Sequence, residues 1–306
     1  MGSRGMVIAG ADFGSNKTGY IVAACVGREL RPLERESRFT RLAEGLHESG
    51  RINGEAVVRT LLWCEEMRKR LKRHGVRRFR AVGTEALRRA SNRQEVLGLI
   101  EDVLGWPVEI LPGAEEGRLT FRGVRLGYPN GPLAIIDVGG GSTEICIGGD
   151  PPARGDEKIR VLSTKAGAVV LTERHGEEWD ALLRAARAEL RRFAPKGELP
   201  GLLTVLGGTG ANLTMMDLGE HDLRDDHIEG HVIERKRLQQ LRKRTAAMSP
   251  KQRTVKLGLP PQRADIQMAG LAILEAALDH LGIRAVRTSR YALRHGVLRS
   301  IAPRRR

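Results

Sequence analysis

The sequence predicts an α/β protein made of two similar domains, and two observations lead to this prediction. A short apolar run, an Asp-x-Gly turn and a second apolar run occur in that order twice, in residues 7–24 and again in residues 133–147. Each occurrence is followed by segments that alternate between helical and strand periodicity. An internal duplication is the economical explanation of such a repeated order.

The first half begins with an expected β-hairpin, formed by strands 7–11 and 20–24 around a polar turn at 12–16. A third strand is expected at 29–39. The elements expected after it alternate in type: helix 54–73, strand 79–82, a helix capped by Asn92 and ending at 104, strand 108–111 and helix 114–124. Helix 54–73 is predicted from apolar residues that recur at helical spacing.

The second half repeats this order. The expected elements are strand 133–136, turn 137–142, strand 143–147, strand 159–163, helix 177–193, strand 203–206, helices 234–247 and 262–281, strand 285–288 and a last helix from about 291. Three strands followed by helix, strand and helix is the order of a ribonuclease-H-like domain, and two such domains form the actin-like ATPase architecture. We therefore predict two actin-like domains, 6–126 and 127–290, flanking a cleft, with helix 291–303 packed back on the first.

The composition gives no indication of a membrane segment, a secretion signal or disulfide bonds. No apolar stretch reaches the roughly 18–20 residues of a membrane helix, and the N-terminal residues show no signal-peptide cleavage pattern. The three cysteines have no paired spacing, so neither disulfides nor a zinc site are indicated. We expect a cytoplasmic protein without a membrane partner.

The charge indicates an anionic partner. The net charge is +15, and the densest basic run lies in residues 68–80. A field of this sign attracts polyanions, although a solvated helix end explains the run equally well. Aromatic residues make up only 4% of the chain and do not interleave with the basic residues, which argues against specific nucleic-acid binding.

The turn at 137–142 has the composition of a phosphate-binding loop. Its glycines let main-chain N–H groups approach a ligand closely, and hydroxyl groups follow them. Two carboxylates flank the loop and could hold Mg²⁺, which prefers carboxylate, water and phosphate oxygens. The residues are Asp137, Gly139, Gly140, Gly141, Ser142, Thr143 and Glu144.

The turn at 12–16 has the same pattern in weaker form. Asp12 supplies a carboxylate, and Gly14, Ser15 and Asn16 supply donors. Lys17 either contacts a phosphate or points to solvent. Two facing loops of this kind could clamp one phosphate group.

A third glycine turn follows a buried strand and precedes a helix. Gly208 and Thr209 lie in it. A helix N-terminus at this position could bind a further phosphate, but a close-packing turn fits equally well.

These motifs identify a family resemblance over nearly the whole chain. The chain resembles the exopolyphosphatase / guanosine pentaphosphate phosphohydrolase family, whose two phosphate loops are similar to residues 12–16 and 137–144. Further family-like stretches are Thr84-Glu85-Ala86-Leu87-Arg88, Gly113-Ala114-Glu115-Glu116-Gly117-Arg118, residues 166–172, Gly207-Gly208-Thr209, Arg263-Ala264-Asp265 and Leu293-Arg294.

The resemblance implies roles for single residues. Glu116 would be the catalytic glutamate, with Glu115 as the less favoured neighbour, and Arg88 would help to hold the substrate. Mg²⁺, with Mn²⁺ as an alternative, would be held by Asp12, Asp137 and Glu144. The implied activity is release of terminal phosphate from inorganic polyphosphate by water attack.

The departures from the family leave alternatives open. Lys17 stands where the family usually has a small hydroxyl residue, and Glu229-Gly230 stands where a His-Gly pair is common. Guanosine pentaphosphate is the second candidate substrate. A kinase of the same architecture and a sensor that binds polyphosphate or nucleotide without hydrolysis are the other functions considered. The oligomeric state is left open, with a homodimer as one option.

Overall fold

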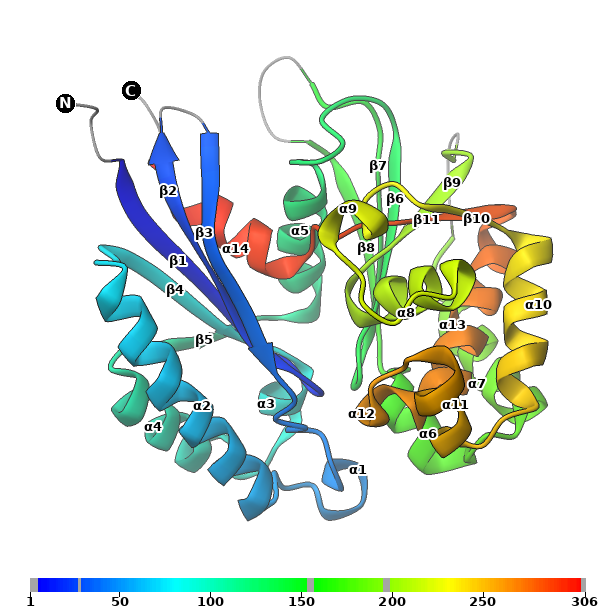
Figure 1. Cartoon of the computed structure of the whole chain (residues 1–306), viewed down its shortest axis with the longest axis horizontal. Helices are drawn as coiled ribbons and strands as arrows, with labels where there is room; N and C mark the ends of the chain where they lie inside the picture. The colour runs from blue at the N-terminus through cyan, green and yellow to red at the C-terminus, as the bar shows by residue number, and fades with distance from the viewer. Residues whose placement is uncertain (1–4, 27–28, 153–156, 195–198, 304–306) are drawn as a thin grey trace. The chain divides into compact units, whose positions relative to one another are not determined.

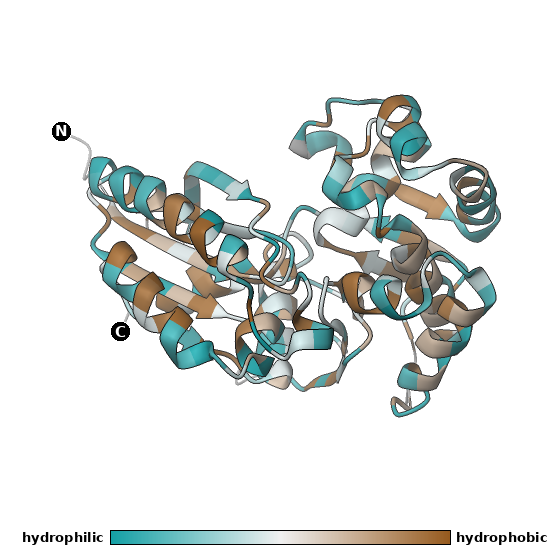
Figure 2. Ribbon diagram, turned by 90° about the horizontal axis from the view of Figure 1, so that it is seen from below, coloured by the Kyte–Doolittle hydropathy of each residue, from teal (hydrophilic) through white to brown (hydrophobic). Residues whose placement is uncertain are grey.

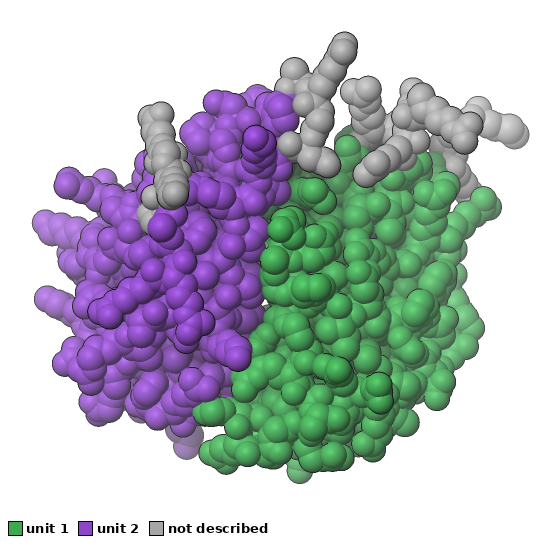
Figure 3. All heavy atoms as spheres, turned by 180° about the vertical axis from the view of Figure 1, so that it is seen from behind, with its two compact units in different colours: residues 1–126, 293–306 green, residues 127–292 purple. Residues whose placement is uncertain are grey.

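The structure is a computed structural model, in which residues 5–26, 29–152, 157–194 and 199–303 are described (Figure 1). The chain divides into two compact units. Unit 1 consists of Met1–Leu126 and Leu293–Arg306, and unit 2 consists of Gly127–Ala292 (Figure 3).

Unit 1 is built on a five-stranded sheet of order β3-β2-β1-β4-β5. Its strands are β1 (Met6–Phe13), β2 (Thr18–Val26), β3 (Glu29–Arg38), β4 (Arg78–Gly83) and β5 (Val108–Ile110). Strands β1, β2 and β3 pair antiparallel, whereas β4 pairs parallel with both β1 and β5. The first half of the sheet is thus a meander, and the second half is built through helical crossovers.

Helices cover both faces of this sheet. They are α1 (Leu46–Ser49), α2 (Gly54–Arg73), α3 (Glu85–Arg89), α4 (Arg93–Leu104), α5 (Gly113–Val124) and α14 (Leu293–Ile301). Along β1, Ala9 and Ala11 pack in the cluster that includes residues of α2 and α4, whereas Ile8 packs with Leu298 of α14. This alternation follows from the two-residue period of a strand. Figure 2 shows hydrophilic and hydrophobic residues alternating along the helices of unit 1.

Unit 2 repeats the topology with one added strand. Its sheet has the order β10-β11-β9-β6-β7-β8. The strands are β6 (Leu133–Val138), β7 (Thr143–Gly148), β8 (Ile159–Thr164), β9 (Leu202–Val205), β10 (Val232–Glu234) and β11 (Ala285–Thr288). As in unit 1, the first three strands pair antiparallel, and two later strands, β9 and β11, run parallel to β6. The added strand β10 pairs antiparallel with β11.

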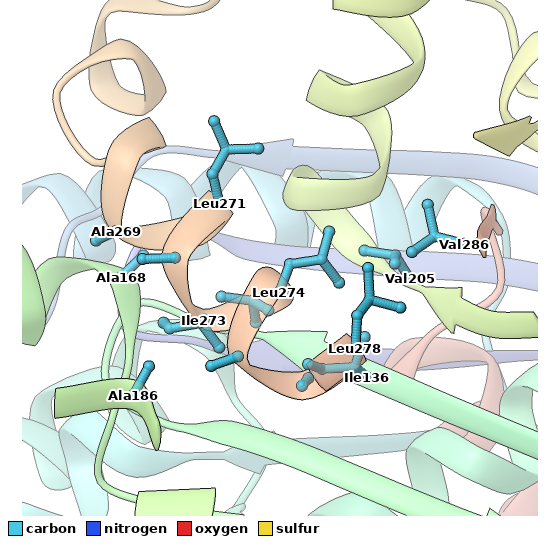
Figure 4. Close-up of a cluster of buried hydrophobic side chains, with 14 of the residues drawn as sticks. Ile136, Ala168, Ala186, Val205, Ala269, Leu271, Ile273, Leu274, Leu278 and Val286 are labelled. Carbon is cyan, nitrogen blue, oxygen red and sulfur yellow. The ribbon is translucent and has the colours of Figure 1, made fainter. Parts of the chain in front are cut away.

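The core of unit 2 is centred on its longest helix. The helices are α6 (Ala168–His175), α7 (Trp179–Leu190), α8 (Gly207–Leu218), α9 (Asp225–Ile228), α10 (Arg235–Ala246), α11 (Pro250–Leu257), α12 (Pro261–Ala264) and α13 (Gln267–Leu281). Figure 4 shows Ile273, Leu274 and Leu278 of α13 among side chains from the sheet, such as Ile136 and Val205. None of the described helices has the length and hydropathy needed to cross a membrane.

The predicted fold class is confirmed, because both units have mixed sheets flanked by helices in the expected order. One helix prediction is wrong. Residues 262–281 form two helices, α12 and α13, which are separated at Asp265 and Ile266. The apolar periodicity runs through the break, because both helices bury residues against the same core, and so the sequence pattern could not reveal it.

Other differences concern helix ends. Asn92 precedes α4, but its side chain does not cap that helix and instead bonds both main-chain groups of Ile52. Several elements were not predicted: helices α1, α3, α6, α9 and α11 and strand β10. The signals for α11 are present in the sequence, since Ser249 and Gln252 form a capping box around Pro250.

Candidate active site

The first glycine loop lies between β1 and β2 and is closed by a hydrogen bond from Gly14 N to Lys17 O at 3.0 Å. A Cβ on Gly14 would lie only 2.8 Å from that oxygen, so the turn requires glycine. The carbonyl groups of Ser15 and Asn16 accept bonds from residues 43 and 41. Both side chains are buried. The loop is therefore anchored through its carbonyl oxygens.

Asp12 lies at the end of β1 and has a cation beside it. The Nε of Arg294, from α14, is 3.0 Å from Asp12 Oδ1, although the two atoms are not aligned for a hydrogen bond. Burial raises the pKa of the Asp12 carboxyl, and Arg294 and Lys17 act against this effect. Charge neutralisation by a cation is the condition under which such a carboxylate is stable.

Lys17 does not point freely into solvent. Its ammonium group lies over the ring of Phe39, 4.2 Å from the ring centre. A cation–π contact of this kind holds the charge near the first loop. The residue as a whole is partly exposed.

The second glycine loop repeats the geometry of the first. Gly139 N donates to Ser142 O at 3.0 Å, and a Cβ on Gly139 would lie 2.9 Å from that oxygen. Gly139 O and Gly140 O accept bonds from the first turn of α6, at residues 168 and 169. The N–H groups of Gly140, Gly141 and Ser142 have no backbone partner within the described part of the chain. They are donors that an anion could use.

Two carboxylates flank this loop as direct neighbours. Asp137 on β6 and Glu144 on β7 are partners in the antiparallel register, so their side chains share one face of the sheet. Glu144 is buried and accepts a bond from Ser163 Oγ at 2.8 Å. Like charges opposite one another are unfavourable, and a bound cation would remove the penalty. The donor set therefore fits a hard divalent cation.

Two hydroxyl groups predicted to bind substrate have protein partners. Thr143 Oγ1 donates to Ala166 O at 2.6 Å, and Thr209 Oγ1 donates to Val138 O at 3.3 Å. Both residues are buried. In this structure their hydroxyl groups hold the second loop and the third glycine turn in place.

The third turn begins α8 and lies against the second loop. A Cβ on Gly207 would lie 3.4 Å from Asp137 Oδ1, and one on Gly208 would clash with the guanidinium of Arg263. Arg263 is buried, and its Nε has no hydrogen-bond partner among the described residues. Burial lowers the pKa of Arg263, against the effect of Asp137 and Asp265.

Arg263 is a candidate site residue to which the sequence analysis assigned no role. A buried guanidinium with an unsatisfied donor is costly unless an anion accepts from it. Its place beside the third turn and Asp137 therefore favours phosphate contact. The family-like stretch at 263–265 was the only signal for it in the sequence.

The two adjacent glutamates of α5 have different environments. Glu116 is buried, whereas the Glu115 side chain is 37% exposed and lies 3.6 Å from Arg118. Glu116 Oε2 accepts a bond from Arg88 Nη1 at 3.2 Å. The Arg88 guanidinium also bonds Glu85 at 2.5 and 2.9 Å and contacts Leu111 O. Of the two glutamates, only Glu116 is both buried and bonded to Arg88 among the described residues.

The predicted metal ligands are divided between the units, with Asp12 in unit 1 and the Asp137–Glu144 pair in unit 2. No group of three or more His, Cys, Asp or Glu side chains that could hold a metal ion is found in the described ranges.

Comparison with models of known protein families assigns the chain to one family. The model of the Ppx/GppA phosphatase family matches residues 21–305, which include the second loop, Glu116 and Arg263. The chain belongs to the Ppx/GppA phosphatase family. The family model begins after the first glycine loop, so the case for that loop depends on its geometry.

Solved structures agree with the family assignment. The Aquifex aeolicus PPX-GPPA enzyme is 26% identical, with 96% of this chain and 99% of that chain covered and a TM-score of 0.80. An exopolyphosphatase from Cytophaga hutchinsonii is 24% identical, with 97% and 98% covered and a TM-score of 0.84. An exopolyphosphatase-like protein has the same identity and coverage, with a TM-score of 0.88. The last two matches show a shared fold.

Proposed function

We propose that this Ppx/GppA protein is an exopolyphosphatase, which releases orthophosphate from the end of inorganic polyphosphate by attack of water. The observation that carries the proposal is the pair of glycine loops with the same Gly N to O turn, at Gly14 and Gly139, each preceded by an aspartate at the end of a strand. The second loop offers main-chain donors, and each loop has a carboxylate beside it, which are groups that a phosphoryl-transfer reaction uses.

Glu116 acts in this proposal as the base that orients and deprotonates the attacking water. Positioned general bases typically contribute about 10²–10⁴ in rate. The Arg88 bond orients the carboxylate, and burial limits its contact with bulk water. The neighbouring Glu115 is partly exposed and pairs with Arg118 instead.

Main-chain N–H groups and charged side chains bind the phosphate chain in this proposal. Free N–H groups of residues 140–142 hold oxygens of the terminal phosphate, and the Arg263 guanidinium neutralises charge on it. Asp12, Asp137 and Glu144 would hold Mg²⁺ or Mn²⁺. When bound, a divalent cation neutralises negative charge on phosphate oxygens and on the facing carboxylates.

Polyphosphate is preferred over guanosine pentaphosphate because of charge. The net charge of +15 favours a long polyanion, and both substrates end in the same phosphoanhydride. The name of the family covers both Ppx and GppA proteins. The test must therefore compare the two substrates directly.

The test measures Mg²⁺-dependent phosphate release from short polyphosphate, long polyphosphate and guanosine pentaphosphate. The variants are Glu116→Gln and, as a matched control on the same helix, Glu115→Gln. We expect Glu116→Gln to lower kcat at least 100-fold with polyphosphate binding retained, and Glu115→Gln to stay within about threefold.

Three outcomes would contradict parts of the proposal. Turnover of Glu116→Gln at the wild-type rate would refute its assignment as the base. Faster release from guanosine pentaphosphate than from polyphosphate would reverse the substrate preference. Tight polyphosphate binding by the wild type without phosphate release would favour the sensor alternative.

A further inference from the structure

The end of α2 and the start of β4 form a strongly basic edge of unit 1. Residues 66–80 contain eight Lys and Arg residues and one acid. Three of these cations have carboxylate partners, since Lys69 pairs with Glu65, Arg70 with Glu34 and Arg80 with Glu109. Five have none within the described ranges, and we call them the cationic edge: Arg68, Lys72, Arg73, Arg77 and Arg78.

A hollow of about 140 Å³ opens on this edge, lined by Arg68, Leu71, Lys72, Val76, Leu104, Gly105 and Trp106. Its lining contains two cations and no acid. Arg68 is held in place, because its Nη1 donates to Val103 O at 3.1 Å and its guanidinium packs against Gly105. Gly105 has a positive φ of 77°, which favours glycine at this contact. A guanidinium that is already ordered loses less entropy when it binds an anion.

The cationic edge is separate from the candidate active-site residues of unit 1. Arg78 pairs with Ile8 near the start of β1, whereas Asp12 pairs with Val82 four residues further along. Four residues of strand span about 13 Å. The first glycine loop lies beyond Asp12. An anion in the hollow would therefore not touch Asp12 or Gly14.

We propose that the cationic edge and its hollow are a second binding site for inorganic polyphosphate, remote from the residues that perform hydrolysis. This proposal rests on the proposed function in the choice of ligand. A site of this kind raises the affinity for long chains by adding contacts that short chains cannot reach.

Polyphosphate fits this site better than nucleic acid does. Single-stranded nucleic acid is held by successive bases stacked on aromatic side chains. Trp106 is the one aromatic residue that lines the hollow, and its ring packs against Phe79 at 5.4 Å between ring centres. A chain of phosphates needs cations and no stacking surface.

The test measures binding of long polyphosphate to the Glu116→Gln protein, in which hydrolysis is suppressed. The test variant adds Arg68→Gln, Lys72→Gln, Arg73→Gln and Arg77→Gln. The matched control adds Lys236→Gln, Lys243→Gln, Arg244→Gln and Lys251→Gln on α10 and α11 of unit 2. Both variants lose four positive charges, and the control cations also lack acidic partners within the described residues.

We expect the test variant to raise the Kd for long polyphosphate at least tenfold, and the control to raise it less than threefold. The logarithm of the association constant decreases linearly with the logarithm of the salt concentration. The magnitude of this slope should be smaller by about 3 in the test variant, because each of the four lost phosphate contacts contributes about 0.7. When the same four substitutions are made in the protein that keeps Glu116, kcat/KM for triphosphate should stay unchanged. If the fourfold variant does not fold, the two double variants Arg68→Gln/Lys72→Gln and Arg73→Gln/Arg77→Gln are compared with control doubles.

An equal loss of affinity for long polyphosphate in the test and control variants would overturn the proposal, since it would show that only the total charge matters. Tighter binding of single-stranded DNA or RNA than of polyphosphate at equal phosphate concentration would overturn it in favour of nucleic acid. A wrong assignment of the enzymatic function would give a different result, because the wild-type protein itself would then release no phosphate from polyphosphate.

Discussion

Arg88 joins two buried carboxylates, those of Glu116 and Glu85, and lies 3.2 Å from Glu116 Oε2. Burial lowers the pKa of the Arg88 guanidinium, but the two carboxylates outweigh this and raise it above its ordinary value. The arginine that the family resemblance associates with substrate is thus bound to the proposed base in this structure. We infer that Arg88 positions Glu116.

Replacing Arg88 by Lys should lower kcat for polyphosphate hydrolysis about 10-fold to 100-fold with little change in KM. A lysine keeps the charge but cannot bond both carboxylates through a planar fork, and a displaced base loses rate steeply. Steady-state kinetics measure the split between kcat and KM. A rise in KM at constant kcat would instead assign Arg88 to substrate binding.

Replacing Glu144 by Gln should stabilise the ligand-free protein and remove its response to Mg²⁺. The change ends the repulsion between Glu144 and Asp137, which is worth about 0.2–1 kcal/mol, and keeps an oxygen that Ser163 can bond. Thermal unfolding with and without Mg²⁺ measures both effects. An equal rise of Tm on Mg²⁺ addition in both proteins would exclude Glu144 as a ligand.

Replacing Arg263 by Met should raise KM about 10-fold to 100-fold and lower the stability of the ligand-free protein. Asp137 and Asp265 would lose a neighbouring cation, and removing one partner of a buried charge pair is destabilising. Kinetics and chemical unfolding check the two parts. Loss of stability at unchanged KM would show a structural role.

Replacing Glu229 by Ala should lower the free energy of unfolding by about 1–3 kcal/mol, since buried partners lose their acceptor. Glu229 accepts bonds from Ser289 Oγ at 3.0 and 3.1 Å and from Arg290 N at 2.9 Å. Burial, together with Glu229, also raises the pKa of Tyr128.

Glu229→Gln is the milder control and should lose less stability than Glu229→Ala. It removes the charge that opposes ionisation of Tyr128, so this phenol should ionise at lower pH. Alkaline spectrophotometric titration detects the change. An unaltered titration of Tyr128 would mean that Glu229 does not act on it.

Acid should destabilise unit 1 through Glu34. Burial alone would raise the pKa of Glu34, but bonds from Tyr20, Arg70 and His74 lower it to about 2. A depressed carboxyl pKa adds stability above about pH 4.5, and this stability is lost as the pH falls toward 2. The full shift corresponds to about 3 kcal/mol, which solvent screening reduces to about 1–2 kcal/mol.

The measurement compares unfolding of wild type and Glu34→Gln from pH 6 to pH 2. The difference in stability between them should shrink as the pH falls through this range. A constant difference across the range would show that Glu34 ionisation does not contribute.

Local patterns were sufficient to predict the strand–turn–strand units at Asp12 and Asp137, because a two-residue apolar period and a glycine turn are properties of adjacent residues. The confirmed topology and the shared Gly14 and Gly139 turns follow from them. The break between α12 and α13 escaped this reasoning, since one apolar stripe serves both helices. The roles proposed for site residues stay predictions.

From its residues alone, the chain could be assigned two repeated α/β domains, two phosphate-type loops and an excess of positive charge. Folding was needed to distinguish buried Glu116 from the partly exposed Glu115 and to place Arg294 beside Asp12. It was also needed to leave Arg263 with a nitrogen that has no hydrogen-bond partner among the described residues. The reason is distance along the chain. Periodicity reports on neighbours within a helix or strand, whereas burial and ion pairing depend on segments that meet only when the sheets and helices pack.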